Sequence, residues 1–349
     1  MNPSAKTLEV IQVARDISRL ARVPHDSESL CETTDGVPIV VRVNANLPDI
    51  FDRARRDGAD GIGLYRSEVL FDRSNTFPNE EEQYEAYCEI ATLTGKAGVR
   101  IRTFDLGVDR LPDDPRHHQR NPSLGLRAIR YSLSDPEQFR TQVRAILRAS
   151  FGRNVDMVLP MISGVRDVIR ARRLVEEERD SLEAGSIAIG HPRLGVMIET
   201  PSAVMTVAQI ARFVDFFCLG TNDLVQYLLA VDRDDPSVAD WYQTLHPAVI
   251  SAIRSVIHVG TNTEIPVTVC GEMAGSPYYV PLLVGLGARE LSMNVNSIAT
   301  VRSTIAELST SKCSQLAERV LLAVTAGDAE IVLKRYYEEH WPFIMSMAR

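Results

Sequence analysis

The chain has 349 residues, of which 45% are hydrophobic and 24% are charged, and its formal net charge is −8. These values are typical of a globular protein that forms one large α/β domain or two smaller ones. An acidic balance without any block of Lys and Arg argues against nucleic acid as the main partner. No apolar run reaches membrane-spanning length, and no signal-peptide pattern opens the chain, so no membrane association is expected. Five cysteines without a Cys-x-x-Cys spacing argue against a disulfide framework and favour a cytoplasmic location.

Strand-like and helical segments alternate along most of the sequence. Residues 4–22 have the spacing of an amphipathic helix, and residues 23–37 are a charged loop. Eight short apolar runs have strand length, at residues 38–43, 61–64, 99–103, 156–160, 194–198, 216–219, 266–269 and 290–293. Helical segments follow them at residues 47–56, 79–93, 166–183, 202–212, 247–259, 278–286 and 298–308, with further helical material ending at residue 150. A polar, proline-rich insertion occupies residues 107–122.

This alternation, over about the length of one such domain, predicts a (β/α)8 TIM barrel with an N-terminal helix and extra C-terminal helices. A doubly wound open sheet competes with it, because alternation alone cannot show that the sheet closes. The predicted organisation is an N-terminal helix and linker at residues 1–34 and a barrel at residues 35–310. Two further helices at residues 311–349 are expected to pack outside the barrel.

Two carboxylates, Glu199 and Asp223, follow directly after neighbouring predicted strands. Parallel strands carry their carboxyl ends to the same rim, so these side chains are expected to converge. Such oxygen ligands suit Mg²⁺, with coordination positions left for water and a phosphate. Each carboxylate alone is more simply explained as a strand or helix cap, but their shared position favours a metal site.

Several cationic and amide side chains follow other predicted strands. Arg66 and Arg102 end apolar runs, Asn222 precedes Asp223, Arg233 follows shortly after, and Arg127 lies beyond the insertion. A planar guanidinium suits phosphate and carboxylate alike, so the set predicts a small, multiply charged anion bound beside the metal. A surface ion pair is the simpler explanation for any one arginine, and Arg127 has the weakest positional argument.

Cys270 ends the predicted strand at residues 266–269 and precedes a glycine. A buried, inert thiol is the usual role of a free cysteine. Its place on the predicted rim makes Cys270 a candidate proton donor, because a thiol can exchange a proton near neutral pH. Cys218 lies within a strand and is expected to belong to the core.

The combination of segments resembles one family. These segments are GIGLYRSEVLF, RTFDLGVDR, NPSLGLRAIR, VLPMI, GVMIETPSA, DFFCLGTNDLVQYLLAVDR, CGEMAG and LSMN. In this order, over about residues 35–310, they resemble the phosphoenolpyruvate-binding barrel of enzyme I, the phosphoenolpyruvate–protein phosphotransferase of the bacterial phosphotransferase system. The segments LHPAV, CGEMAG and LGARELSMN resemble the nitrogen-related branch of this family more than the sugar branch. Pyruvate phosphate dikinase and phosphoenolpyruvate synthase carry more distant versions of the barrel.

The resemblance implies a role for each candidate residue. Glu199 and Asp223 would bind Mg²⁺. The phosphate and carboxylate of phosphoenolpyruvate would be held by Arg66, Arg102, Asn222, Asp223 and Arg233, with Arg127 beside them. Cys270 would give a proton to the methylene carbon as pyruvate forms. The resemblance also implies a homodimer, a phosphohistidine domain as immediate partner, and a small HPr-like carrier protein.

Two departures from the family qualify these expectations. Val108-Asp109-Arg110 replaces a glycine-rich Asp-Lys pair, and the loop through Arg120 is altered, which puts a basic contact from this loop in doubt. Only about 35 residues precede the barrel, where enzyme I has a histidine-bearing half. None of the seven histidines has the family's phosphohistidine context, so this chain alone is not expected to accept the phosphoryl group.

Two other functions compete with phosphoryl transfer. One is a non-catalytic module that senses phosphoenolpyruvate or dimerises an assembly. The other is a Mg²⁺-dependent lyase or aldolase acting on a small keto acid. Cys270 and the complete arginine set favour the transferase over the sensing module. The paired Gly-Thr-Asn-Asp and Cys-Gly-Glu motifs favour it over the lyase.

Overall fold

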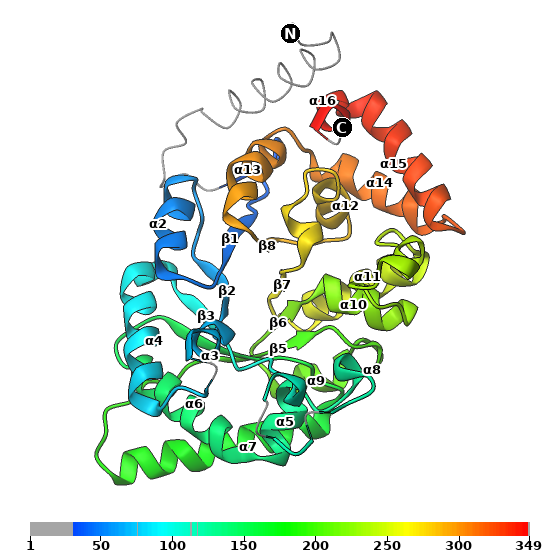
Figure 1. Cartoon of the computed structure of the whole chain (residues 1–349). Coiled ribbons are helices and arrows are strands. Elements are labelled where there is room, and N and C mark those ends of the chain that lie inside the picture. The colour runs from blue at the N-terminus through cyan, green and yellow to red at the C-terminus, as the bar shows by residue number, and fades with distance from the viewer. Residues whose placement is uncertain (1–30, 75, 112–113, 117, 348–349) are drawn as a thin grey trace, which may run out of the picture.

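Eight parallel strands close into a barrel in chain order, which confirms the predicted TIM-barrel architecture (Figure 1). The computed structural model describes residues 31–74, 76–111, 114–116 and 118–347. The helix predicted at residues 4–22 therefore lies outside the described residues. The strands are β1 (Val40–Ala45), β2 (Ile62–Arg66), β3 (Val99–Arg102), β4 (Val155–Leu159), β5 (Leu194–Ile198), β6 (Phe216–Leu219), β7 (Val267–Val269) and β8 (Glu290–Met293).

Closure of the sheet excludes the doubly wound alternative. The last strand pairs in parallel with the first, with Val40 opposite Glu290 and Val43 opposite Met293. Every residue of β4, β5 and β6 is buried, because helices cover these apolar strands on the outside and barrel side chains cover them on the inside. The continuous apolar runs seen in the sequence have this physical origin.

Helices surround the barrel and join consecutive strands (Figure 1). They are α2 (Pro48–Arg56), α3 (Glu68–Ser74), α4 (Glu80–Thr94), α5 (Ala128–Ser134), α6 (Pro136–Ala149), α7 (Val165–Ala184), α8 (Pro201–Met205), α9 (Val207–Ile210), α10 (Thr221–Leu229), α11 (Pro247–Asn262), α12 (Val280–Gly285) and α13 (Ile298–Ala306). The single helix predicted at residues 202–212 is wrong. The chain there forms α8, α9 and a 3₁₀ turn, because Thr206 leaves helical geometry and its hydroxyl bonds back to the Ser202 carbonyl at 2.8 Å.

Ion pairs fill the amino-terminal end of the barrel. Arg100 is 3% exposed, lies 2.8 Å from Glu290 and stacks 4.6 Å above the Phe216 ring. Asp156 accepts from Arg193 at 2.6 Å. Paired charges of this kind carry little net stability, but they close this end and leave the carboxyl ends of the strands for ligand binding.

Three helices follow the barrel within the described residues, where two are predicted. They are α14 (Thr310–Leu321), α15 (Ala326–His340) and α16 (Pro342–Met347), and they gather at one side of the barrel near α12 (Figure 1). Asp35, from the segment before β1, accepts hydrogen bonds from the Thr310 amide at 3.1 Å and hydroxyl at 2.6 Å. This carboxylate therefore caps α14 from a distant part of the chain.

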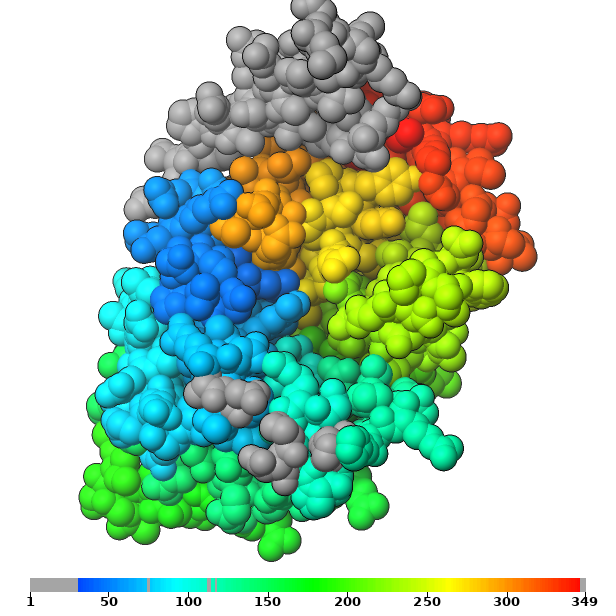
Figure 2. All heavy atoms as spheres, viewed as in Figure 1, coloured from blue at the N-terminus to red at the C-terminus, as the bar shows by residue number. Residues whose placement is uncertain are grey.

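None of the helices in the described ranges combines the length and the apolar composition needed to span a bilayer. In the space-filling view the blue residues that follow the first strands and the yellow-green residues after β6 lie on opposite sides of a hollow (Figure 2).

Candidate active site

A cavity of about 730 Å³ lies at the carboxyl ends of the strands and is called the main cavity below. Seven of the eight residues predicted from the sequence line it, namely Arg66, Arg102, Arg127, Asn222, Asp223, Arg233 and Cys270. The eighth, Glu199, is fully buried and lies behind Gly220. A Cβ atom at Gly220 would approach Glu199 Oε2 to 2.6 Å, so the turn into α10 needs glycine to pass over the carboxylate.

Asp105 joins two of the predicted arginines. It lies 3.2 Å from Arg102 Nη1 and accepts from Arg127 at 2.8 and 3.1 Å. Glu68 pairs with Arg102 at 3.1 Å and accepts from the Asp105 amide at 2.7 Å. Burial would lower the pKa of Arg102, but its carboxylate neighbours outweigh that effect and raise it. Both arginines are thus held in fixed positions before any ligand arrives.

The pairing partners Asp105 and Glu68 are site residues that the sequence analysis missed. Burial opposes ionisation of Asp105, yet Arg102 and Arg127 hold its pKa below the ordinary range. A buried arginine needs a carboxylate partner, and an acid three residues after Arg102 is the signal that points to Asp105.

Arg66 and Arg233 are the less constrained cations of the main cavity. Arg66 is exposed, and among the described residues no hydrogen bond or ion pair reaches its guanidinium. Arg233 lies 3.6 Å from Asp223 and 4.0 Å from Asp234, distances of loose ion pairs. Their charge is available to an anionic ligand.

Two carboxylate oxygens in the site are buried without a hydrogen-bond donor. Glu199 Oε1 accepts from the Met161 amide at 2.6 Å, but Glu199 Oε2 and Asp223 Oδ1 receive no hydrogen bond. Burial, Asp223 and Asp105 raise the pKa of Glu199 to about 8. Buried oxygens without a hydrogen-bond donor, and the repulsion between the two carboxylates, are the features that a divalent cation relieves, so the donor set fits Mg²⁺. No cluster of three or more ligating side chains forms within the described ranges, so a ligand and water would complete the coordination.

Cys270 is 4% exposed and places its thiol at the wall of the main cavity. Its thiol donates to the Leu219 carbonyl at 3.5 Å, and interaction with the neighbouring Cys218 thiol together with burial raises the pKa of Cys270 well above its usual value. The thiol therefore stays protonated at neutral pH and can donate a proton. Cys218 is fully buried among barrel side chains, as expected for a core residue.

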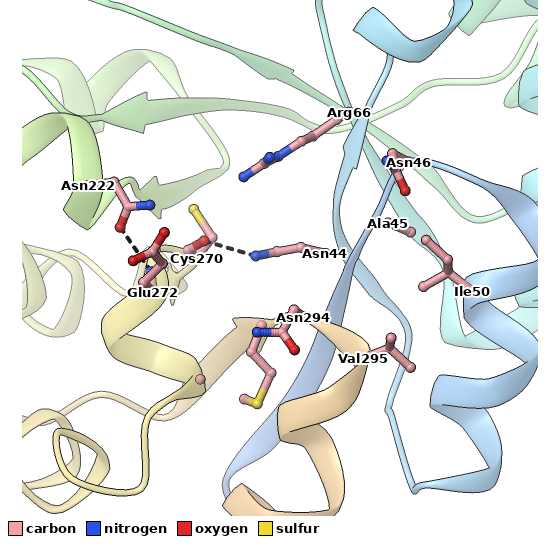
Figure 3. A pocket seen from close by; sticks show the side chains of 13 residues that line it. Asn44, Ala45, Asn46, Ile50, Arg66, Asn222, Cys270, Glu272, Asn294 and Val295 are labelled. Atoms are coloured by element: carbon pink, nitrogen blue, oxygen red, sulfur yellow. Dashed lines mark hydrogen bonds between the residues drawn. The ribbon is translucent and has the colours of Figure 1, made fainter. Parts of the chain in front are cut away.

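Asn222 connects the end of β6 to the end of β7 at the edge of the cavity. Its Oδ1 accepts from the Glu272 amide at 2.9 Å, and its backbone carbonyl accepts from the Tyr242 hydroxyl at 3.0 Å. Figure 3 shows Arg66, Asn222 and Cys270, which come from three different strand ends, around one space.

A buried glutamine on α6 supports the arginine-bearing strand ends. Gln142 is 1% exposed and donates to the Ser67 hydroxyl at 3.0 Å and to the Tyr87 hydroxyl at 2.8 Å. Its carbonyl oxygen accepts from the Phe104 amide at 2.9 Å. The Ser67 hydroxyl in turn donates to the Arg102 carbonyl at 2.7 Å. This network sets the β2 and β3 ends relative to each other.

The altered loop keeps a basic side chain at the cavity despite the changed sequence. Val108–Arg110 forms a 3₁₀ turn, and Arg110 lines the main cavity and pairs with Asp72. No histidine of the described residues lines the cavity.

Comparison with known proteins agrees with the resemblance seen in the sequence. Residues 21–310 match the family described as PEP-utilising enzyme, PEP-binding domain. A protein named phosphoenolpyruvate-protein phosphotransferase from Haloferax volcanii is 39% identical over 95% of this chain and 59% of its own length. The protein of the same name from Listeria monocytogenes is 38% identical over 87% of this chain and 54% of its own length.

A third relative, from Escherichia coli K12, is named for the phosphoenolpyruvate-dependent phosphotransferase system. It is 39% identical over 91% of this chain and 43% of its own length. This chain thus spans about half the length of the curated relatives that it matches. The family match and these identities lead to one conclusion: the chain belongs to the PEP-utilising enzymes and carries their PEP-binding domain.

Proposed function

We propose that this chain is the catalytic, phosphoenolpyruvate-binding part of a phosphoenolpyruvate–protein phosphotransferase of the enzyme I type. It would bind phosphoenolpyruvate with Mg²⁺, give the phosphoryl group to a histidine on a domain outside this sequence, and release pyruvate. One observation carries the proposal: Arg66, unpaired among the described residues, lines one cavity together with Asp223 and the protonated thiol of Cys270, and the donor-free carboxylate of Glu199 lies just behind Gly220 in the wall of that cavity.

Each group has a part in this chemistry. Arg66 and Arg233 would bind the phosphate, while Arg102 and Asn222 would orient the ligand and Arg127 would support Arg102 through Asp105. Glu199 and Asp223 would hold Mg²⁺, which when bound supplies positive charge beside the transferring oxygens.

When the bond between phosphorus and the enolate oxygen breaks, its electron pair stays on that oxygen. Cys270 would then give its proton to the methylene carbon, which completes pyruvate. Its raised pKa supports this role, because a thiol that is already ionised has no proton to give. A homodimer and an HPr-like carrier stay predictions made from the resemblance, and a cytoplasmic location stays a prediction made from the cysteine pattern.

The proposal is tested by titration calorimetry of the chain with phosphoenolpyruvate, with Mg²⁺ and with a chelator. We expect Mg²⁺-dependent binding and no phosphohistidine on the chain alone, as judged by intact mass at alkaline pH. Adding a histidine-bearing domain of a relative should produce phosphorylated domain and pyruvate. Absence of Mg²⁺-dependent binding would refute the site, and a phosphoryl group on this chain alone would refute the need for a second domain.

A further inference from the structure

A second cavity opens beside the main cavity, with a volume of about 310 Å³, and is called the side cavity (Figure 3). The two cavities share six lining residues, which are Asn46, Arg66, Asn222, Cys270, Gly271 and Glu272. The side cavity adds the ends of β1 and β8 and their loops, through Asn44, Ala45, Ile50, Gly275, Met293, Asn294 and Val295. Cys270 thus lies on the boundary between both spaces.

The residues found only in the side cavity include no charged side chain. Asn44 is already engaged, because it donates to the Cys270 carbonyl at 3.0 Å and accepts from the Ser292 hydroxyl at 2.7 Å. Asn294 accepts one long hydrogen bond of 3.4 Å from Ser297, and no described residue bonds to the Asn46 amide. The amides of Asn46 and Asn294 are therefore available to a ligand, next to apolar walls.

Two charged side chains of the described residues line this cavity, and they are Arg66 and Glu272. Glu272 supplies the negative charge. Its backbone amide is fixed by Asn222, its side chain is exposed, and no cation of the described residues pairs with its carboxylate. A hydroxyl group on a ligand could accept a hydrogen bond from an asparagine amide and donate one to the Glu272 carboxylate.

We propose that the side cavity is a subsite for a small, hydroxyl-bearing substituent on the carbon that Cys270 protonates. The chain would then bind 2-oxo acids and enol phosphates that extend pyruvate at its methyl carbon, with a hydroxymethyl group preferred over a methyl group. This inference rests on the proposed function, since the position of that carbon follows from proton transfer by Cys270. The volume of about 310 Å³ far exceeds the space of one water molecule, so such a substituent fits.

The probes are pyruvate, 2-oxobutyrate and 4-hydroxy-2-oxobutyrate, each measured with Mg²⁺ by displacement of phosphoenolpyruvate in a calorimeter. We expect the hydroxylated acid to bind about fivefold more tightly than 2-oxobutyrate, the gain of one neutral hydrogen bond. Asn294→Ala should remove this preference. Val295→Phe should weaken 4-hydroxy-2-oxobutyrate about tenfold and leave pyruvate unchanged, because Val295 lines the side cavity and not the main cavity.

A matched control, Val324→Phe, changes an exposed valine of the loop before α15 and should alter neither affinity. Equal binding of the two extended acids, or an equal effect of Val295→Phe on pyruvate, would overturn the subsite while the proposed function stands. Failure of phosphoenolpyruvate and pyruvate themselves to bind would overturn the proposed function and the subsite with it.

Discussion

Arg102 and Asp105, three residues apart, form an ion pair of 3.2 Å across the turn that leaves β3. Because Asp105 also binds Arg127, one carboxylate holds two arginines in the wall of the main cavity. Arg66, the last residue of β2, lies opposite Arg102 in the sheet register and has no such restraint among the described residues. The arginines of this site therefore differ in how far they depend on protein partners.

This difference predicts that replacing arginine by lysine affects binding at both positions but lowers stability at only one of them. Arg66→Lys should weaken phosphoenolpyruvate binding by at least about 1.5 kcal/mol and leave the melting temperature unchanged, because a point charge replaces a free planar fork. Arg102→Lys should weaken binding and also lower the free energy of unfolding by about 1.5 kcal/mol, because one ammonium cannot bridge Glu68 and Asp105. Calorimetry and urea unfolding separate the two effects. Equal destabilisation by both variants would contradict the assignment.

The proposed metal ligands are tested by substitutions that remove the negative charge of the side chain and keep its shape. Glu199→Gln and Asp223→Asn should abolish the Mg²⁺-dependent part of phosphoenolpyruvate binding and leave the circular dichroism spectrum unchanged. Glu272→Gln is the matched control, because this carboxylate lines the same cavity and is not assigned to the metal. Retention of Mg²⁺ dependence in both ligand variants would exclude them as the metal site.

Gln142 and Gln83 form a matched pair for testing the buried network. Gln83 is fully buried, accepts from the Tyr87 hydroxyl and donates to the Pro78 carbonyl, but among the described residues it makes no hydrogen bond to the β2 or β3 ends. Replacing either glutamine by Leu should cost about 1–3 kcal/mol of stability, because buried polar groups lose their partners. Gln142→Leu alone should also weaken phosphoenolpyruvate binding, by about fivefold or more. Similar binding by both variants would make Gln142 a purely structural residue.

The hydrogen bonds of Asp35 predict that the junction between the barrel and α14 loses stability at low pH. Hydrogen bonds from Thr310 and Thr33 hold the pKa of Asp35 well below its usual range. A lowered native pKa contributes stability above the unfolded value of about 4, and this contribution is lost as the pH falls through the native value. Asp35→Asn should therefore lower the melting temperature at pH 7, and the difference from wild type should shrink towards pH 3. Asp240→Asn, an exposed aspartate, should show no such trend.

The sequence predicted which side chains line the main cavity better than it predicted the residues that hold those side chains in place. Arg102, Asn222 and Cys270 lie at or just beyond the ends of apolar strands. Because parallel strands end at a common rim, their convergence follows from topology alone. The partners of the arginines were missed, because pairing with Glu68 depends on how two loops fold toward each other. Gln142 carries no signal at all, since a helical glutamine is usually solvated.

The errors in the outer elements have local causes. Thr206 interrupts the helix predicted at residues 202–212 through a side-chain bond that propensity does not reveal. A third tail helix begins at Pro342, a residue that is favourable at a first helical position and that could have signalled it.

The ion pairs of Arg100, Arg193, Asp156 and Glu290 have a kinetic consequence, because they close the barrel at its amino-terminal end. Ligands then enter and leave the main cavity only at the carboxyl ends of the strands. An incoming nucleophile and the departing product would have to use this one opening in turn. Under the proposed function, the small ligand would enter first and would leave only after the phosphoryl acceptor has withdrawn.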